Sequence, residues 1–478
     1  MMKLPDHKTK IVCTIGPASS SLEIIQQLLL AGMNVARLNF SHGNFASHAQ
    51  VIETLRRAAQ IAGRRLAIMA DLPGPKIRIG RLAEEPIDLE QDALFTLTTE
   101  PILGDISRVS VSFAPLPRVV KPGDKIFLND GLIELLVQEV AGREVHCRVQ
   151  VGGELSSRKG LNLPDIDLGI NAFTEHDYEC LKFALEHGVD AVSQSFVESA
   201  ADITALRQAA ADLGHNPFVI AKIERSRALE NLDDIFQVAD GIMIARGDLG
   251  VEMPIERMAV VQKQLMRRAN ILGKPIITAT QMLESMTSNR RPTRAEATDV
   301  ANAILDGSDC VMLSGESATG RYPVAAVIML AKIAAAIEPH RSVYHAREIL
   351  HPFDPDQPIN LADIIAFSVE STLEKISPAA VFVPTRGGAT ARSISRFRGP
   401  KWVVAVSSEE TTCQRLVFSY GVYPVLEPDH PDDWSSFIRT WLKAHEVEGN
   451  LVIVTEGPSR KRPETNNRME IFDLNARI

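Results

Sequence analysis

Short apolar runs alternate along this chain with longer segments of helical periodicity. Three runs lie near the start, at residues 10–16, 33–40 and 66–71, and five more lie at 190–196, 218–224, 241–245, 275–280 and 309–314. Strands that alternate with helices predict a parallel sheet with right-handed crossovers. Eight such units favour a closed (β/α)8 TIM barrel over an open doubly wound sheet. The GxGxxG fingerprint of the open alternative is absent after the early strands.

The alternation is interrupted once and is followed by a further region. Residues 73–160 show little helical periodicity and carry turn signals such as KPGD at 121–124 and NDG at 129–131, which predicts a small, mostly β insert. Strands expected at 381–384, 402–407 and 451–455, with helices between them, predict an α/β domain near the end. The expected domains are a barrel of residues 1–72 and 161–341, a lid at 73–160 and a C-terminal α/β domain at 342–478.

Charge and apolar patterning exclude several classes of protein. The chain has 51 Lys and Arg against 60 Asp and Glu, a formal charge of −9, which argues against nucleic-acid or anionic-membrane partners. The longest apolar run, 324–337, is short and interrupted by Lys332, and the first ten residues lack an apolar signal region. Five widely spaced cysteines form no CxxC pair, so we expect reduced thiols in a cytoplasmic protein.

Polar residues gather where the predicted barrel strands end. Catalytic groups of such barrels sit at the carboxyl ends of the strands, so these positions predict an active site. The residues at these ends are Arg37, Asn39, Ser41 and His42, then Asp71, then Lys222 and Glu224, then Arg246 and Asp248, then Thr278, Thr280 and Gln281, and finally Ser314 and Glu316.

The residue types at these ends indicate a chemistry. Glu224 and Asp248 are hard oxygen ligands on adjacent strands, which suit Mg²⁺. Arg37 and Lys222 are cations suited to phosphate or carboxylate oxygens. Together they favour phosphoryl-transfer or enolate chemistry. The alternatives are structural: a single strand-end carboxylate is usually a helix cap, and Arg246 could pair with a carboxylate of its own barrel.

Ordered sequence blocks resemble the pyruvate kinase family. They are colinear over the barrel and both edges of the insert, and the C-terminal region fits in length and pattern. The blocks are TKIVCTIGPAS (9–19), GMNVARLNFSHG (32–43), DLPGPKIR (71–78), SRKGLNLP (157–164), AKIE (221–224), MIARGDLGVE (243–252), ITATQMLESM (277–286) and RPTRAEATDVANAILDGSDCVMLSGESATGRYP (291–323).

The resemblance implies phosphoryl transfer from phosphoenolpyruvate to ADP, giving pyruvate and ATP. By similarity, Glu224 and Asp248 hold Mg²⁺ or Mn²⁺, Lys222 neutralises the phosphoryl group in flight and Arg37 grips the phosphate. Thr280 and the amides of Gly247 and Asp248 bind the substrate carboxylate. Thr280 with water, or Glu316, would supply the proton that the product enolate needs, and the sequence does not choose between them.

The same resemblance assigns a nucleotide side. Arg78 and Lys159, from the two edges of the insert, would reach the ADP phosphates, while Asn39, Ser41 and His42 line the nucleotide. The insert would then act as a lid whose closure excludes water.

Two positions depart from the commonest family pattern. Many members carry Glu where this chain has Lys76, and Thr where it has Leu72. Members with that Glu need K⁺, held by groups that match Asn39, Ser41, Asp71 and the carbonyl of Leu72. Because the ammonium of Lys76 supplies positive charge near the phosphate, we hypothesise activity that is independent of K⁺.

The C-terminal region is where this family binds effectors. A glycine turn before a helix start is an anion site, and its alternative is an ordinary turn. A homotetramer is the family expectation, and a phosphorylated small molecule is the expected effector. The expected effector residues are Thr385, Arg386, Gly387, Gly388, Ala389, Thr390 and Arg460.

Two other functions fit parts of this pattern. A Mg²⁺-dependent barrel lyase or aldolase that stabilises pyruvate enolate would use the same Glu, Asp and Arg, but would not need Arg78, Lys159 or a lid. A catalytically silent metabolite sensor would be expected to lack Lys222, Glu224 or Asp248, and all three are present.

Overall fold

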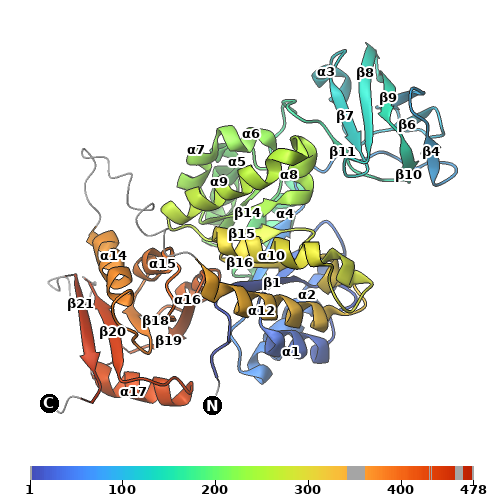
Figure 1. The fold of residues 1–478 in the computed structure, drawn as a ribbon. Helices are drawn as coiled ribbons and strands as arrows, with labels where there is room; N and C mark the ends of the chain where they lie inside the picture. Colours follow the sequence, from blue (N-terminus) through green and yellow to red (C-terminus); the bar gives the residue numbers. More distant parts are fainter. Residues whose placement is uncertain (1–2, 342–360, 430, 432, 458–466, 476–478) are drawn as a thin grey trace.

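The computed structural model describes residues 3–341, 361–429, 431, 433–457 and 467–475. Figure 1 shows a central barrel, with the insert and the C-terminal domain on opposite sides of it. This arrangement leaves one end of the barrel facing the insert and the other end facing the C-terminal domain.

Eight parallel strands close the barrel, as the sequence predicts. β1 pairs with β16 through Lys10↔Cys310, and this contact excludes the open sheet. In spatial order the strands are β1 (Lys10–Thr14), β2 (Met33–Asn39), β3 (Ala67–Leu72), β12 (Ala191–Gln194), β13 (Phe218–Ile223), β14 (Gly241–Ala245), β15 (Ile276–Ala279) and β16 (Cys310–Leu313).

Amphipathic helices surround the barrel and bury their apolar faces against the strands. Local signals set where they begin: Thr174 and Asp177 form a capping box on α4, and Thr293 and Glu296 form one on α10. The main helices are α1 (Leu22–Ala31), α2 (Phe45–Ala62), α4 (Glu175–Glu186), α5 (Ala200–Asp212), α6 (Ser226–Glu230), α7 (Leu232–Val238), α8 (Arg246–Glu252), α9 (Met258–Ile271), α10 (Arg294–Asp306), α11 (Gly315–Ala318) and α12 (Pro323–Ile337).

Within the described residues, the stretch 323–340 is long and apolar enough, by length and composition, to cross a membrane. It consists of α12 and the turn that follows. Ala326, Val327, Leu330 and Ala334 of this helix are fully buried in the barrel core. Four apolar residues of α12 therefore form part of the barrel core.

The insert is a β domain with its own core. Its six-stranded sheet has the order β11-β7-β8-β9-β5-β6, and β10 pairs with β4 beside it. β11 lies just past residue 160 and pairs with β7, so the sheet reaches Asn162. The elements are β4 (Ile87–Leu89), β5 (Leu94–Thr98), β6 (Arg108–Ser110), α3 (Leu116–Val119), β7 (Lys125–Leu128), β8 (Ile133–Ala141), β9 (Glu144–Val151), β10 (Gly153–Leu155) and β11 (Leu161–Asn162).

The C-terminal domain is a five-stranded sheet of order β19-β18-β17-β20-β21 with helices packed on it. The predicted strands and helices are present, and β19, β21 and α17 are additions that the sequence reading missed. β21 is the antiparallel edge strand, none of its residues is buried, and it lacks a long apolar run. The elements are α14 (Leu361–Leu373), β17 (Val381–Pro384), α15 (Ala389–Ser395), β18 (Val403–Ser407), α16 (Glu410–Leu416), β19 (Val422–Leu426), α17 (Trp434–Ala444), β20 (Leu451–Glu456) and β21 (Arg468–Asp473).

The C-terminal domain covers the amino-terminal end of the barrel. Phe418 stacks on Phe218, the first residue of β13, with ring centroids 5.3 Å apart. Lys10, the first residue of β1, donates to the carbonyl of Val422 at 2.7 Å. The carboxyl ends of the strands, where the predicted site lies, are therefore at the other end, toward the insert (Figure 1).

Candidate active site at the barrel mouth

Four predicted site residues meet at the carboxyl ends of β2, β3 and β13. Lys222 and Glu224 are two residues apart, so both side chains leave the strand on the same face and point into the barrel mouth. Arg37 and Asp71 come from the neighbouring strands. All four are buried, with 9%, 2%, 7% and 2% of Arg37, Asp71, Lys222 and Glu224 exposed.

Asp71 is the anionic centre of this cluster. Its carboxylate accepts hydrogen bonds from Arg37 Nη2 at 2.5 Å and Nε at 3.0 Å, and from Ser193 Oγ at 2.6 Å. Lys222 Nζ lies 3.4 Å away. Burial alone would raise the pKa of Asp71, but Arg37 and Lys222 lower it to about 2. The carboxylate is therefore ionised and holds both cations in place.

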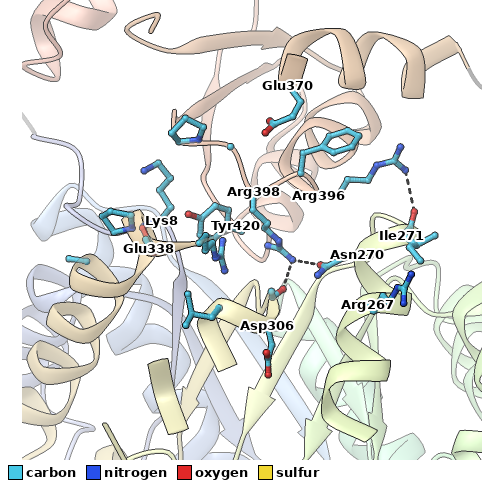
Figure 2. Close-up of a pocket in the computed structure, with 18 of the residues that line it drawn as sticks. Lys8, Arg267, Asn270, Ile271, Asp306, Glu338, Glu370, Arg396, Arg398 and Tyr420 are labelled. Atoms are coloured by element: carbon cyan, nitrogen blue, oxygen red, sulfur yellow. Dashed lines mark hydrogen bonds between the residues drawn. The ribbon is translucent and has the colours of Figure 1, made fainter. Parts of the chain in front are cut away.

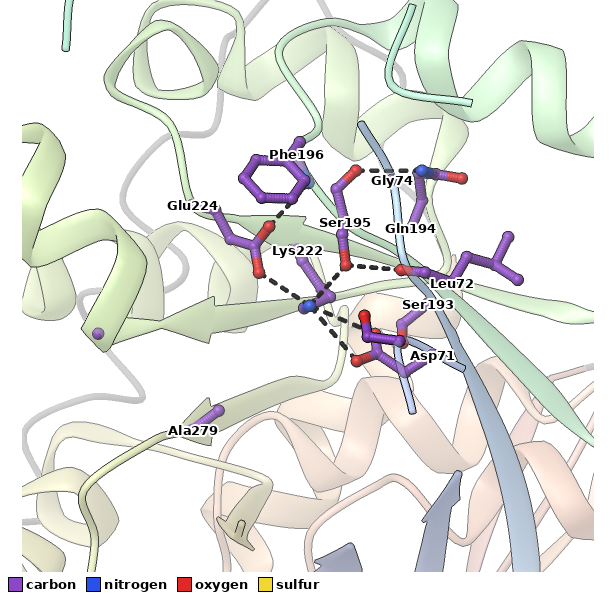
Figure 3. A network of polar contacts seen from close by, with 12 residues as sticks. Asp71, Leu72, Gly74, Ser193, Gln194, Ser195, Phe196, Lys222, Glu224 and Ala279 are labelled. Carbon is purple, nitrogen blue, oxygen red and sulfur yellow. Dashed lines mark hydrogen bonds and ion pairs between the residues drawn. The ribbon is translucent and has the colours of Figure 1, made fainter. Parts of the chain in front are cut away.

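Lys222 lies between two carboxylates and a hydroxyl. Its Nζ is 2.8 Å from Glu224 Oε1 and 2.6 Å from Ser195 Oγ, which in turn donates to the carbonyl of Leu72 at 2.7 Å (Figure 3). Burial opposes its charge, but Asp71 and Glu224 together raise the pKa of Lys222 above its ordinary value. The ammonium group is therefore charged and held in one position.

Two functional residues, Ser193 and Ser195, were missed from the sequence. They lie at the end of β12, the one middle strand for which no strand-end residue was chosen. The next residue, Phe196, donates its backbone N–H to Glu224 Oε2 at 2.8 Å. The signal in the sequence was a pair of serines at alternate positions of a predicted strand end. Such a pair indicates a functional position less clearly than a charged residue does.

Asp248 lies in the first turn of α8, directly after β14. Burial and the charge of Glu224 raise its pKa to about 6, because the two carboxylates are not fully neutralised by Lys222 and Lys76. Such a pair fits a divalent cation. No group of three or more His, Cys, Asp or Glu is placed to hold a metal in the described parts of the chain. Two protein carboxylates with the other positions left to water and substrate are typical of Mg²⁺.

Thr280 takes an unusual backbone conformation just after β15. Its φ is 65°, in the left-handed region that β-branched residues rarely adopt. This places Thr280 Oγ1 2.9 Å from the N–H of Gly247, so the two groups expected to bind the substrate carboxylate lie together. Arg246 stabilises the turn: it donates to the Thr280 carbonyl at 2.8 Å and pairs with Asp299 at 2.7 Å. Arg246 is thus both paired within its barrel and a positioning residue for Thr280.

Asn39 is the last residue of β2, and Ser41 and His42 lie on the loop that follows. Asn39 Oδ1 accepts the N–H of Ser41 at 3.1 Å, which tightens this loop. Burial lowers the pKa of His42, and the positive charges of Lys76 and Arg78 lower it further. The loop therefore faces the cations at the edge of the insert.

The two edges of the insert run side by side. Arg78 and Gly160 form an antiparallel bridge, which places Lys159 beside the Arg78 strand. The guanidinium of Arg78 donates to the carbonyl of Arg158 at 2.8 Å. The structure therefore brings together the two cations predicted to meet ADP, on the part of the insert nearest the barrel.

Three of the four groups that match a K⁺ site have protein partners among the described residues. The Leu72 carbonyl accepts from Ser195, Asp71 is held by Arg37, Ser193 and Lys222, and Asn39 Oδ1 accepts from Ser41. Lys76 is close enough to Asp248 and Glu224 for their charges to act on its pKa, which burial and Arg78 lower overall. Lys76 therefore places a cation near these groups.

The predicted effector turn connects β17 to α15. Gly388 has a φ of 79°, and its N–H donates to Thr385 Oγ1 at 2.9 Å. Arg386 is exposed and its Nε lies 3.5 Å from Glu409. Ala389 and Thr390 begin the helix. Arg460 lies outside the described residues.

Known protein domains match this chain over most of its length. Residues 6–327 match the barrel domain of pyruvate kinase, and residues 363–472 match its alpha/beta domain. The chain belongs to the pyruvate kinase family. A pyruvate kinase of Thermococcus litoralis is 46% identical over 474 residues, covering 99% of this chain and 100% of the relative. One of Geobacillus stearothermophilus is 41% identical, covering 97% and 80%.

A solved structure agrees with the family assignment. The crystal structure of a pyruvate kinase from Cryptosporidium parvum superposes with a TM-score of 0.91 at 34% identity, covering 98% of this chain and 96% of that one. Pyruvate kinases are phosphotransferases of glycolysis, and the chain is therefore an enzyme of that class. The lyase alternative has no support from these relatives.

Proposed function

We propose that the barrel mouth transfers the phosphoryl group of phosphoenolpyruvate to ADP with Lys222 as the central cation. The observation that carries this is the position of Lys222, held between Asp71 and Glu224 beside Arg37. Arg37 and Lys222 bind the phosphoryl oxygens, and a fixed ammonium in a buried site stabilises the charge of the transferring group. Glu224 and Asp248 would hold Mg²⁺, which supplies Lewis-acid stabilisation of phosphoryl oxygens.

Thr280 Oγ1 and the Gly247 amide bind the substrate carboxylate in this proposal. The proton for the enolate comes by way of Thr280 and water. Glu316 is a poorer donor, because it is fully buried and accepts the N–H groups of Leu283 at 2.9 Å and Ser314 at 2.7 Å. Both side-chain oxygens of Glu316 are thus taken up by backbone N–H groups, which stabilises a turn.

The insert acts as the lid over the nucleotide, with Arg78 and Lys159 on the ADP phosphates and Asn39, Ser41 and His42 below them. The lid already approaches α8: a side chain at Gly131 would lie 3.2 Å from Val251. Closure would exclude water from the transferring phosphoryl group.

The reaction is tested by coupling pyruvate formation to lactate dehydrogenase. We expect pyruvate only when phosphoenolpyruvate, ADP and Mg²⁺ are all present. Consumption of phosphoenolpyruvate at the same rate without ADP would contradict phosphoryl transfer and favour a lyase. Asp248→Asn serves as the metal-site control, because it removes one ligand charge while keeping the shape of the side chain.

Activity is proposed to be independent of K⁺, because Lys76 supplies a cation near the site and three of the four K⁺-type ligands have protein partners. We expect similar rates with and without KCl at constant ionic strength. A fall of more than roughly tenfold without K⁺ would overturn this. Lys76→Glu should create K⁺ dependence, and Lys76→Gln is the matched control that removes charge without adding an anion.

A phosphorylated small molecule is proposed as an activator at the turn of residues 385–390, supported by the exposed Arg386 and the helix start beside Gly388. Glucose 6-phosphate, ribose 5-phosphate, fructose 1,6-bisphosphate and AMP should be titrated at low phosphoenolpyruvate. A flat response of the rate to all four would contradict this proposal.

We also propose that the protein is a cytoplasmic homotetramer. A monomer in light-scattering measurements would contradict this assembly.

A further inference from the structure

A cavity of about 600 Å³ lies between the barrel and the C-terminal domain. Figure 2 shows it, with Glu370, Arg396 and Arg398 on the side of the C-terminal domain and Arg267 and Asp306 on the side of the barrel. The cavity is at the end of the barrel away from the active site, and none of the turn residues 385–390 lines it. Its size is that of pockets for small organic ligands, roughly 300–1,000 Å³.

Two arginines that line the cavity have unused donors. The side chains of Arg396 and Arg398 are 9% and 6% exposed. Arg398 binds Asp309 and Asn270 through its terminal nitrogens, and Arg396 binds Asp363. The buried Nε of each arginine has no hydrogen-bond partner within the described part of the chain. A buried N–H group without an acceptor costs free energy of folding. An oxygen atom of a bound ligand could accept a hydrogen bond from each Nε and remove this cost.

The charges around the cavity also favour an anion. Lys8 and Arg267 line it, and neither takes part in an ion pair among the described residues, whereas Lys263 is paired with Asp306. The Glu338 carboxylate accepts hydrogen bonds from the backbone N–H groups of Lys8 and Thr9, at 2.9 and 2.7 Å. The unpaired cations therefore outnumber the unpaired carboxylates.

Glu370 is the carboxyl group that faces these cations without a hydrogen bond or ion pair in the described structure. Only 8% of Glu370 is exposed. Burial, with added repulsion from Glu374, raises its pKa to about 7. Near neutral pH a large share of Glu370 is therefore uncharged and can donate a hydrogen bond to an anion.

The remaining lining is apolar and aromatic. Ile271, Leu305, Phe397 and Tyr420 contribute to it, and the guanidinium of Arg398 lies 5.2 Å from the ring centre of Tyr420. We propose that this interdomain cavity is a second ligand site, for a small oxyanion, a carboxylate or a phosphate ester, attached to a compact apolar or planar body. Since both domains supply lining residues, the ligand would tie them together.

The proposal is tested with full-length protein and two probes, para-fluorobenzoate and para-fluorophenyl phosphate, observed by fluorine NMR. Phosphoenolpyruvate and Mg²⁺ are present without ADP, so that the active site is occupied. We expect saturable line broadening and a raised melting temperature with at least one probe, and neither with the neutral para-fluorobenzyl alcohol. Which probe binds distinguishes carboxylate from phosphate ligands.

Two variants locate the binding. Arg396→Gln removes an unpartnered donor, and Ala335→Phe fills the cavity from the barrel side; each should weaken probe binding by about tenfold or more. Thr385→Ala, on the turn outside the cavity, should leave it unchanged. Should Arg396→Gln fail to fold, Ala335→Phe still decides. Absence of saturable binding to the parent, or equal binding to Ala335→Phe, would overturn the proposal.

Discussion

The side-chain nitrogen of Lys222 lies 2.8 Å from a carboxylate oxygen of Glu224, two residues along the same strand. Both side chains are almost fully buried, so the pair is shielded from water and held at one geometry. Its position at the carboxyl end of β13 places a fixed cation beside a predicted metal ligand. This relation makes Lys222 the most informative residue to change.

Lys222→Met should strongly reduce turnover. Removing the ammonium takes away the charge proposed to stabilise the transferring phosphoryl group, a loss of about 100- to 1,000-fold in kcat. Steady-state kinetics by the coupled assay measures it, and Lys222→Arg, which keeps a cation, should lose less. Circular dichroism must show a folded protein, because Asp71 and Glu224 lose a buried partner. A kcat within tenfold of the parent would contradict the role.

Thr280→Ser should keep most activity, whereas Thr280→Val should not. Serine retains the hydroxyl that faces Gly247 and tolerates the left-handed backbone better than a β-branched residue. Valine keeps the branch and removes the hydroxyl. We expect a KM for phosphoenolpyruvate raised by about tenfold or more in Thr280→Val. Equal kinetics of the two variants would show that the hydroxyl is not used.

Arg246→Gln should change the KM for phosphoenolpyruvate but not the KM for ADP. Arg246 donates to the carbonyls of Ala279 and Thr280, so its loss releases the turn that presents Thr280. We expect a higher KM for phosphoenolpyruvate and an unchanged KM for ADP, a split that general destabilisation would not produce. Asp299→Asn, which weakens only the ion pair of Arg246, is the control and should have a smaller effect. Parallel rises in both KM values would refute this.

Glu370→Gln should stabilise the protein at neutral and higher pH. The folded-state pKa of about 7 lies above the ordinary value of 4.5, so burying the charge costs stability as the pH rises between these values. Below 4.5 both states are protonated and the variant gains nothing from this group. Above 7 the gain should reach about 3 kcal/mol.

Urea denaturation of Glu370→Gln and the parent at about pH 5 and about pH 8 measures this gain. Glu374→Gln is the comparison variant: Glu374 is exposed, and its neutralisation should give only the smaller gain that comes from relieving its repulsion of Glu370. If the gain in stability from Glu370→Gln were larger at the lower pH, the pH dependence would have the wrong sign. That result would contradict a raised pKa of the buried Glu370 carboxyl group.

Local pattern was enough for the architecture. The apolar runs of the barrel, their alternation with helices and the interruption by turn signals are all properties of neighbouring residues, and they predicted the barrel, the insert and the C-terminal sheet. The edge strand β21 was missed because none of its residues is buried and no long apolar run marks it. The same local pattern also predicted which charged residues lie at the strand ends, namely Arg37, Asp71, Lys222 and Glu224.

The sequence by itself therefore determined the fold class, the family resemblance and the charged residues of the barrel mouth. Only the tertiary structure decided that Ser193 and Ser195 complete the cluster around Asp71 and Lys222, and that Arg246 positions Thr280. It alone brought Arg396 and Arg398 into a cavity against the barrel. The physical reason is that side-chain periodicity is local, whereas these contacts depend on closure of the barrel and on domain packing, which join residues far apart in the chain.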